Sequence, residues 1–556
     1  NEDVKKSDIN TLEAADVSNP RREGGYSYHD ASTAGVSAKY KVRKGEVLKI
    51  KIAISYTNIE NAWENMESDC DHWDFDNVRK EAQEEWNREM GRIKVKGGSR
   101  DQRVKFYTDL WHTLLGRHKL NDYNGDYPDF TGETKKGEKS DPGFRVRQIP
   151  GDKKGSAKFN MYNSDAFWLT QWNLNILWGL AWPHLLDDFS ASLVQYADNG
   201  GLLPRGPCAG GYSYIMTGCP ATNLIVSAYM KGLLRKVDPE HAFEIMKQNH
   251  QPGGMMGDDD IDFYVKNGWR PRNAGVTLEW AFQDWALSQM ALKMGKRKDA
   301  AYYLKRSSGW KNLFNEEHGL IFPRDKDGNW MHTDPLRGRG WVEANAWQGT
   351  WSVSHDIPGL AELMGGNDKL CDKLNYAFEM AEPSHFVYSY SGGYVSYANQ
   401  PGCSNAHVFN YAGKPWLSQY WVRKVNEQAY GGTTPDKGYG GHDEDQGQMG
   451  GVSALMSMGL FSLKGTTSVN PVYEITGPVF DEVVIMLDND YYQGDSFIIR
   501  THNNSDENCY IQKAELNGVG LDQCYFSHDD FARGGILELW MGDKPNYNWG
   551  TIKMSK

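Results

Sequence analysis

The sequence lacks any long hydrophobic run, because no stretch approaches the roughly 20 apolar residues that a membrane-spanning helix requires. Hydrophobic residues make up 39% of the 556 residues and the mean hydropathy is -0.67, which is typical of a soluble globular chain. Basic residues are also few: 61 Lys and Arg stand against 73 Asp and Glu, for a net charge of -12. Such a chain repels phosphate backbones, so we expect neither a membrane span nor a nucleic-acid partner.

Cysteine is scarce and gives no recognisable framework. The seven cysteines are odd in number and show neither a CxxC pair nor the spacing of a zinc site. Cys208 with Cys219, or Cys509 with Cys524, are conceivable disulfides, and buried free thiols are an equal alternative. The chain begins at Asn1 with no apolar leader segment, so we expect a processed or truncated start.

Aromatic residues are abundant in a polar, glycine-rich background, with 20 Trp, 30 Tyr and 59 Gly. This combination is typical of sugar sites, because the C–H faces of a pyranose stack on aromatic rings while its hydroxyl groups need polar partners. Most individual Trp residues are expected to be core. Only the aromatic clusters beside carboxylates therefore indicate function.

The pattern changes along the chain, which is longer than one hydrophobic core usually organises. Residues 1–60 end in the apolar alternation Leu48–Ile54 and predict the remnant of a β domain. Residues 61–97 predict a solvated helical linker. Residues 98–463 predict successive helices joined by long loops, and residues 464–556 a small β unit.

The helical region repeats one amphipathic period after another. On its first helix one face collects Tyr107, Leu110, Trp111, Leu114 and Leu115. The further predicted helices are Leu185–Tyr196, Ala221–Leu234, Leu278–Met294, Ala300–Phe314, Asp368–Met380, Trp416–Tyr430 and Gln448–Phe461. The predicted late strands are Glu482–Leu487, Ser496–Thr501 and Cys509–Leu516, the last followed by the turn signal Asn517-Gly518. Together they predict a multidomain α+β protein with an α/α toroid whose loops build a pocket.

The first candidate site is the loop Gly438–Gln448, where Asp443, Glu444 and Asp445 lie between glycines just before a helix. Acids at such a position often only cap the helix and complement its dipole. Here the flanking glycines let the backbone approach a ligand, and Asp443 and Asp445 are spaced to share one water or metal. We interpret this aspartate pair as catalytic.

The second candidate is Gly340–Gln348, where Glu343 is the only carboxylate among tryptophans, alanines and amides. An apolar surrounding favours the protonated carboxyl that a general acid requires. Trp347 in the same segment is a candidate substrate-binding ring. On this segment alone, a solvated glutamate at the start of a helix is an equal alternative.

Two further segments carry a weaker signal. Asp165 lies beside aromatic residues in Tyr162–Trp172, where it is able to clamp sugar hydroxyls, although a capped core helix is the more common meaning. The acidic run Asp258–Asp262 fails the EF-hand pattern, because its sixth position is Phe263 where that calcium loop has Gly. We expect a solvated acidic loop there.

Several motifs together resemble glycoside hydrolase family 92, and they keep their order from about Tyr107 to the C-terminus. They are Val342–Gln348, Asn410–Trp416, His442–Met449, Asn503–Ser505 with Tyr510–Gln512, and Met541–Asn546. The resemblance implies an exo-acting, calcium-dependent α-mannosidase that inverts the anomeric centre. It also implies an (α/α)6 catalytic domain behind an N-terminal β-sandwich that is mostly missing here.

The resemblance assigns roles to single residues. Glu343 matches the family's general acid, and Asp443 and Asp445 match its D-x-D pair, with Asp445 the expected general base. Inversion requires roughly 6.5 to 9.5 Å between acid and base so that a water fits. Calcium in the family contacts the mannose hydroxyls and helps to distort the ring, and the sequence assigns it no ligands here.

The chain departs from the family at Asn399 and Gln400, where members that cut α-1,2 bonds commonly carry His-Glu against the aglycone. We expect these amides to bind substrate and to favour another linkage. The expected partners are mannose-containing glycans, met by a secreted, periplasmic or cell-surface bacterial protein. The alternatives are another (α/α)6 hydrolase, of the α-glucoside type, and a non-catalytic glycan-binding protein, against which the three catalytic carboxylates argue.

Overall fold

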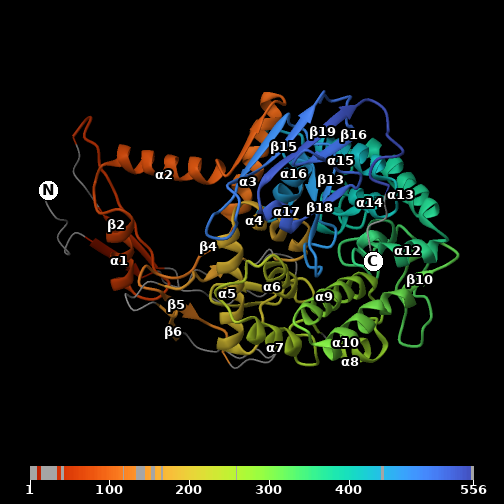
Figure 1. Cartoon of the computed structure of the whole chain (residues 1–556). Coiled ribbons are helices and arrows are strands. Elements are labelled where there is room, and N and C mark those ends of the chain that lie inside the picture. The colour runs from red at the N-terminus through yellow and green to blue at the C-terminus, as the bar shows by residue number, and fades with distance from the viewer. Residues whose placement is uncertain are drawn as a thin grey trace. The chain divides into compact units, whose positions relative to one another are not determined.

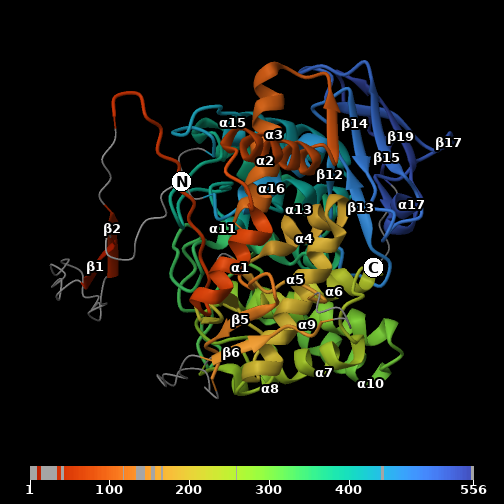
Figure 2. The ribbon, with the colours of Figure 1, turned by 90° about the vertical axis from the view of Figure 1, so that its left-hand side faces the viewer.

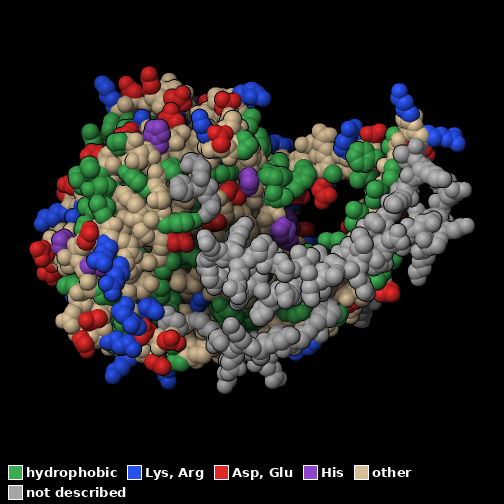
Figure 3. All heavy atoms as spheres, turned by 180° about the vertical axis from the view of Figure 1, so that it is seen from behind, with side chains coloured by type: hydrophobic (Ala, Val, Ile, Leu, Met, Phe, Trp, Pro, Cys, Tyr) green, Lys and Arg blue, Asp and Glu red, His purple; other side chains and the backbone are tan. Residues whose placement is uncertain are grey.

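A computed structural model describes residues 9–13, 34–38, 43–116, 118–132, 145–151, 157–164, 167–257, 259–439 and 444–551. The chain divides into a first unit, Asn1–Ala53 with Asp71–Trp73, and a second unit, Ile54–Cys70 with Asp74–Lys556. None of the described helices combines the length and the apolar character that crossing a bilayer demands. On the face drawn in Figure 3, acidic and basic side chains both occur across the described surface.

The first unit contains one antiparallel strand pair, β1 (Ile9–Glu13) and β2 (Ala34–Ala38). The strand predicted at Leu48–Ile54 is wrong: the segment has no regular structure, and Ile52 is 85% exposed. An alternating segment forms a strand only where a neighbour takes up its backbone hydrogen bonds and covers its apolar face. The described residues supply no such neighbour.

The second unit begins with α1 (Ile59–Asp69), α2 (Phe75–Met90) and β3 (Ile93–Lys96). The side chains of Asn58 and Asp74 accept backbone N–H groups and cap the two helices. Helix is therefore confirmed for most of the predicted linker. It is wrong for Ile93–Lys96, because β14 offers this short alternating segment an antiparallel partner.

Helices are the main regular structure of the second unit. They are α3 (Arg100–Leu115), α4 (Leu174–Ala181), α5 (Pro183–Gly200), α6 (Pro220–Met230), α7 (Pro239–Asn249), α8 (Ile261–Asn267), α9 (Ala274–Lys293), α10 (Arg297–Ser307), α11 (Ala346–Gly349), α12 (Ile357–Met364), α13 (Asn367–Ala381), α14 (Val408–Tyr411), α15 (Pro415–Tyr430), α16 (Gln448–Met458) and α17 (His528–Ala532). Short 3-10 turns are η2 (Thr170–Trp172), η3 (Ser308–Leu313), η4 (Thr350–Ser352), η5 (Glu382–Ser384), η6 (Gln400–Gly402) and η7 (Asn405–His407).

The predicted helices coincide with α5, α6, α9, α10, α13, α15 and α16, with shifts at their ends. The last of them stops at Met458 because Gly459, with φ of 71°, takes the left-handed conformation that ends a helix. Helices α4, α7, α8 and α12 were not predicted. Figure 2 shows α3 and α16 side by side.

Most of the C-terminal strands join a six-stranded sheet in the order β17-β16-β19-β15-β14-β3, which lies beside α15 in Figure 1. Only β15 and β19 run parallel in it. Its C-terminal strands are β14 (Glu482–Met486), β15 (Ser496–His502), β16 (Tyr510–Leu516), β17 (Val519–Gly520) and β19 (Gly535–Gly542). The three predicted strands are thus confirmed, and Asn517 and Gly518 form the turn after β16 with φ of 53° and 77°.

A second sheet has the order β12-β13-β18, formed by β12 (Leu460–Phe461), β13 (Val472–Ile475) and β18 (Tyr525–Ser527). Short antiparallel pairs hold the loops between helices. They are β4 (His118–Lys119) with β7 (Tyr162–Asn163), β5 (Asp126–Asp129) with β6 (Arg145–Gln148), β8 (Gly206–Cys208) with β9 (Gly211–Ser213), and β10 (Phe314–Asn315) with β11 (Leu320–Ile321).

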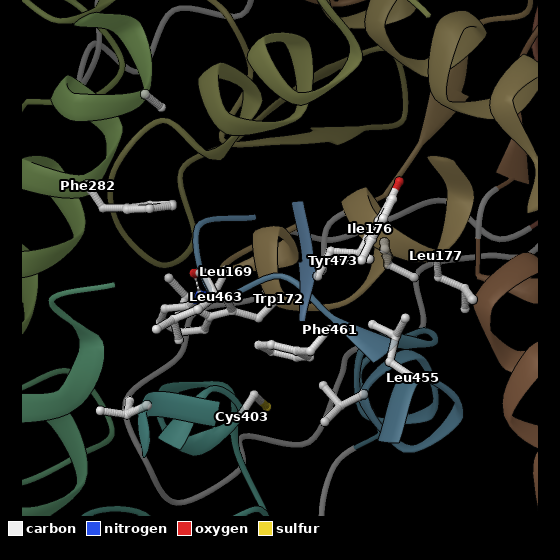
Figure 4. Packing of buried hydrophobic residues seen from close by; sticks show 14 of the residues in the cluster. Leu169, Trp172, Ile176, Leu177, Phe282, Cys403, Leu455, Phe461, Leu463 and Tyr473 are labelled. Atoms are coloured by element: carbon white, nitrogen blue, oxygen red, sulfur yellow. Dashed lines mark hydrogen bonds between the residues drawn. The ribbon is translucent and has the colours of Figure 1, made fainter. Parts of the chain in front are cut away.

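One large core joins the helices to the second sheet. Trp172, Phe461 and Tyr473 lie together in it, each no more than 2% exposed (Figure 4). Trp172 Nε1 donates to the backbone oxygen of Leu463 across 3.0 Å, so its one polar atom is satisfied inside the core. Burying a large apolar side chain stabilises a fold by roughly 1.5 to 3 kcal/mol, so this cluster holds the two layers together.

The buried face of α3 differs from the predicted one. Phe106 and Leu110 are fully buried, whereas Trp111 and Leu115 are 38% and 42% exposed. The core side of the helix also carries Asp109, whose charge is paired with Lys105. A buried ion pair thus takes the place of apolar residues, which rotates the buried face.

Two smaller expectations are resolved by side-chain contacts. Cys219, Cys509 and Cys524 are separate buried thiols, so neither of the considered disulfides is formed. The acidic run 258–262 is not simply solvated, because Asp260 is 3% exposed and pairs with Arg272 at 3.1 Å and Lys326 at 2.9 Å. Residue 258 lies outside the described residues.

Candidate active site

Glu343 lies at a sharp turn in the loop before α11. Its φ is 50°, a left-handed conformation that costs a non-glycine residue roughly 1 to 3 kcal/mol and is most often retained at functional sites. Asn345 anchors the loop: its Oδ1 accepts from Gln348 N at 3.0 Å, and its Nδ2 donates to the backbone oxygens of Ser391 and Gly393, both at 2.9 Å. The loop is therefore fixed on both sides of the turn that presents Glu343.

Asp445 lies in a second strained turn, directly before α16. Asp445, Gln446 and Gly447 all have left-handed φ values, of 56°, 55° and 93°. A Cβ atom on Gly447 would meet the backbone of Thr113 at 2.4 Å, so glycine is required there for close packing on α3. Packing against α3 thus holds the turn that carries Asp445.

Glu444 is the member of the acidic triplet that serves the helix. Its Oε2 accepts from Gly447 N at 2.7 Å and its Oε1 from Gly450 N at 3.0 Å, at the N-terminus of α16. His112 Nδ1 lies 3.2 Å from Glu444 Oε2. The capping interpretation of acids before a helix therefore holds for Glu444.

Asn399 and Gln400 connect the two carboxylates. Asn399 Nδ2 donates to Glu343 Oε2 at 2.8 Å, and Gln400 Nε2 donates to Asp445 Oδ2. Asn399 has extended backbone, with φ of -153° and ψ of 159°. The two carboxylates are thus contacted by the side chains of one dipeptide, at the start of η6.

A small cavity of about 40 Å³ lies next to this arrangement. It is lined by Val342 and Ala344, the two neighbours of Glu343, by Pro401 after Gln400, and by aromatic rings that include Trp341. Glu343 and Asn399 instead line an adjoining depression, in which Tyr388 and Tyr390 are the aromatic residues.

Glu279, from α9, was missed by the sequence analysis and lines the small cavity. Burial raises the pKa of its carboxyl. Hydrogen bonds from Thr217 Oγ1 and from Trp168 Nε1, the latter at 3.2 Å, act in the opposite direction and lower this pKa. The only signal for Glu279 in the sequence was a carboxylate directly before the apolar residues Trp280–Phe282 of a predicted helix. The run Tyr388–Tyr397, rich in Tyr, Ser and Gly, was the unused signal for the tyrosines of the depression.

The remaining predicted site residues are found elsewhere or lie outside the described residues. Trp347 is 9% exposed and packs against Tyr376 and Tyr394, with ring centroids 5.8 and 5.2 Å away, whereas Trp341 lines the cavity. A sugar-binding role for Trp347 stays a prediction. Asp165 and Asp443 lie outside the described residues.

The described residues near the carboxylates suit a hard cation through neutral oxygens. Among them no three His, Cys, Asp or Glu side chains gather as a metal cluster. Two buried amide oxygens, Gln400 Oε1 and Asn405 Oδ1, have no hydrogen-bond partner in the described structure. Because Ca²⁺ accepts amide and backbone oxygens together with water, the donor chemistry of Gln400 and Asn405 fits this ion.

Known proteins were compared with the chain as a whole. Residues 61–543 match the family described as the glycosyl hydrolase family 92 catalytic domain. Among curated proteins, an uncharacterized secreted glycosidase of Arthroderma benhamiae is 25% identical, over 90% of this chain and 61% of its own length. The chain thus spans 61% of that relative.

Two solved structures from Bacteroides thetaiotaomicron resemble the chain. A family GH92 inverting mannosidase is 27% identical with a TM-score of 0.78, covering 98% of this chain and 72% of that one. A family GH92 α-mannosidase has a TM-score of 0.79 at 22% identity, covering 98% and 69%. The second likeness, at its lower identity, shows the fold alone.

Proposed function

The chain belongs to glycosyl hydrolase family 92, and from this membership we propose that it is an inverting exo-α-mannosidase acting on terminal mannose of glycans. The observation that carries the proposal is the pair of hydrogen bonds by which adjacent amides, Asn399 and Gln400, hold Glu343 and Asp445. The 27% identity to a family GH92 inverting mannosidase supports it.

Glu343 acts as the general acid in this proposal and Asp445 as the general base. Glu343 gives its proton to the glycosidic oxygen as the bond to C1 breaks. Asp445 takes a proton from the water that attacks C1 from the opposite face, which turns an α-linked mannose into β-mannose. Inversion needs a gap of roughly 6.5 to 9.5 Å between acid and base for that water.

Asn399 is suited to contact Glu343, which alternates between a protonated and an ionised form in this proposal. Its Nδ2 donates to an ionised Glu343, and the same amide, turned over, offers Oδ1 to accept from a protonated Glu343. Asn399 is therefore able to hold the acid before and after proton transfer. In this proposal it positions Glu343 as well as facing the substrate.

Calcium belongs to the proposal as a bound cofactor. Gln400 and Asn405 are its candidate ligands, because each has a buried oxygen with no hydrogen-bond partner among the described residues. When bound, the ion supplies electrostatic attraction for sugar hydroxyl groups.

Architecture and location complete the proposal. Two features support an (α/α)6 toroid for residues 98–463. Successive helices such as α9 and α10 pack against each other, and longer loops, such as the one that carries Glu343, join other helices. In the same proposal, residues 1–60 belong to an N-terminal β-sandwich. The name of the Arthroderma relative as a secreted glycosidase supports a secreted protein, in the periplasm or at the cell surface.

The deciding experiment is release of free monosaccharide from defined glycans. Purified protein in calcium-containing buffer is incubated with α-mannobioses, a high-mannose glycan and α-glucobioses, and products are separated by anion-exchange chromatography. We expect mannose from the non-reducing end and none with Glu343→Gln. Glucose release without mannose would move the chain to another hydrolase class, and binding without any product would indicate a non-catalytic glycan-binding protein.

A further inference from the structure

A further cavity of the second unit is separate from the cavity and the depression beside Glu343. It has a volume of about 540 Å³ and is formed by the start of α3, the helix α15 and the strand β16 with its flanking loops. We call it the α15–β16 cleft. It shares no lining residue with the cavity and the depression beside Glu343, and its size is ordinary for a small-ligand site.

We propose that the α15–β16 cleft is a second glycan-binding site, which takes a neutral oligosaccharide while the catalytic centre works on a chain end. The proposal rests on the proposed function for the identity of the glycan. Its physical basis is the combination in one cleft of two aromatic rings, carboxylates without an ion-pair partner, and cations that already have partners.

The aromatic part consists of Tyr420 from α15 and Tyr510 from β16. Their rings are nearly parallel, at 7°, with centroids 6.4 Å apart, and both are half-buried. Gln419 fixes the spacing, because its Oε1 accepts from the backbone N–H of Ile511 at 2.8 Å. Neighbours of the two tyrosines are thus bonded to each other, and the rings form a preset surface for pyranose C–H groups.

The acceptor part consists of Asp506, Glu507 and Asp543, which line the same cleft and are exposed. Among the described residues none of the three takes part in an ion pair. Their carboxylates are therefore available to accept hydrogen bonds from hydroxyl groups, and such bonds to a charged acceptor are about twice as strong as neutral ones.

The three cations that line the cleft each have a partner. Lys105 is paired with Asp109 and lies 4.0 Å over the ring of Tyr439. Arg423 donates to the backbone oxygens of Pro478 and Ser505. Lys424 Nζ makes a longer contact, 3.9 Å from Glu382 Oε1. The unpaired charges are negative, which disfavours phosphate and sulfate groups as ligands, and the carboxylates form no metal cluster among the described residues.

Two of the sequence motifs that lie outside the catalytic centre contribute residues to this cleft. Tyr510 and Asp543 belong to the motifs Tyr510–Gln512 and Met541–Asn546, neither of which lines the cavity or depression at Glu343. Gln512 Nε2 donates to Lys544 O at 2.8 Å, which joins the two motifs. One residue of each motif, Tyr510 and Asp543, therefore lines the cleft.

The test is hydrogen exchange of the intact protein with and without α-1,6-mannotriose, which locates binding without needing turnover. We expect the saccharide to slow exchange in residues 504–512 of the wild type. This protection should be lost in Tyr510→Ala. In Asp543→Asn, an exposed change that leaves folding untouched, the apparent affinity for the saccharide should fall about tenfold. Tyr123→Ala is the matched control, because Tyr123 is 64% exposed and does not line the cleft.

Kinetics supply the second arm. Tyr510→Ala is expected to raise KM for yeast mannan severalfold and to leave hydrolysis of a mannobiose unchanged. Absence of protection by the saccharide, protection by a tri-lysine peptide alone, or undiminished protection in Tyr510→Ala would each overturn the proposal. Failure of the proposed function is separate: the wild type would release no mannose from any substrate, whatever the exchange shows.

Discussion

The side-chain amide of Asn399 donates to Glu343 Oε2 across 2.8 Å, although 56 residues separate them in the chain. Its neighbour Gln400 makes the corresponding bond to Asp445. One short segment thus contacts both carboxylates. Changes in this segment are expected to alter catalysis as well as substrate choice.

Glu343→Gln should remove proton donation and preserve the fold, since the two side chains have the same shape. We expect kcat/KM on mannobioses to fall roughly 100- to 10,000-fold. Aryl mannosides with good leaving groups should lose much less, because their departure needs no proton. Equal losses on both substrate types would contradict a general-acid role, and an unchanged melting temperature is the control.

The stereochemistry of the first product tests the role of Asp445. Proton NMR early in hydrolysis of an α-linked substrate should show β-mannose before mutarotation adds the α form. Initial α-mannose would instead indicate retention, in which Asp445 does not activate water.

Linkage choice should follow from the two neutral amides. We expect another α-mannobiose to exceed α-1,2-mannobiose in kcat/KM, because Asn399 and Gln400 lack the charged acceptor of a His-Glu pair, a difference of roughly 1.5 to 3 kcal/mol for a buried bond. If α-1,2-mannobiose is the best substrate of the unmodified protein, these positions do not set the linkage.

The paired change Asn399→His with Gln400→Glu should have two effects. Relative activity on α-1,2-mannobiose should rise. At the same time a second carboxylate beside Asp445 disfavours its ionised form, so the acidic limb of the pH profile of kcat/KM should move to higher pH. A pH profile identical to that of the wild type would contradict the contact between Gln400 and Asp445.

Calcium removal should abolish mannose release, and calcium addition should restore it. Independently of activity, an ion at 100 times its Kd stabilises the folded state by about 2.7 kcal/mol, which raises the melting temperature. Asn405→Ala should shrink this rise. Asn312→Ala is the matched control, because it also loses an amide donor to a backbone oxygen, Gly309 O at 2.9 Å, but on the exposed surface. A rise of full size in Asn405→Ala would remove it from the ligand set.

Lys231 should make stability depend on pH. Burial lowers the pKa of its amine to about 7, and its Nζ donates to Asn175 O at 2.7 Å. Between that value and the usual 10.5 the unfolded chain binds the proton that the folded chain releases, so stability rises with pH in this window and is lowest below about 7.

Lys231→Met removes this penalty. Its free energy of unfolding at pH 6 should exceed that of the wild type by on the order of 2 to 4 kcal/mol, and the difference should shrink towards pH 10. Denaturant unfolding at the two pH values measures it, with exposed Lys298→Met as the control. A difference independent of pH would mean that packing, and not the charge, is responsible.

The sequence predicted elements whose periodicity is local and missed those that depend on distant partners. Helices α9 and α15, at 20 and 16 residues, are long enough to be recognised from their own residues, and Gly295, with φ of 76°, follows α9. The buried face of α3 was not found, because it relies on Asp109, which accepts from Tyr439 OH at 2.7 Å, a contact across 330 residues. Lys105 and Asp109 are an i,i+4 pair within α3, but the helix alone does not reveal that the pair is buried.

The candidate site divides in the same way. Glu343 and Asp445 were identified by the motifs around them, which carry the family resemblance. The contacts of Asn399 and Gln400 with these carboxylates were not, because each joins loops that only the folded chain brings together. The capping role of Glu444 was not assigned either, since position in the loop does not reveal which carboxylate turns back to cap the helix.

Strand β3 has a consequence for the order of events during synthesis. It closes the edge of a sheet whose other members begin at Glu482, so on the ribosome its Ile93 and Val95 are made long before β14 exists to pair with them. Until the last part of the chain emerges, this short apolar strand has no partner in the sheet. Nascent chains halted before residue 482 should therefore recruit chaperones through residues 93–96, and charged replacements of Ile93 and Val95 should weaken that recruitment.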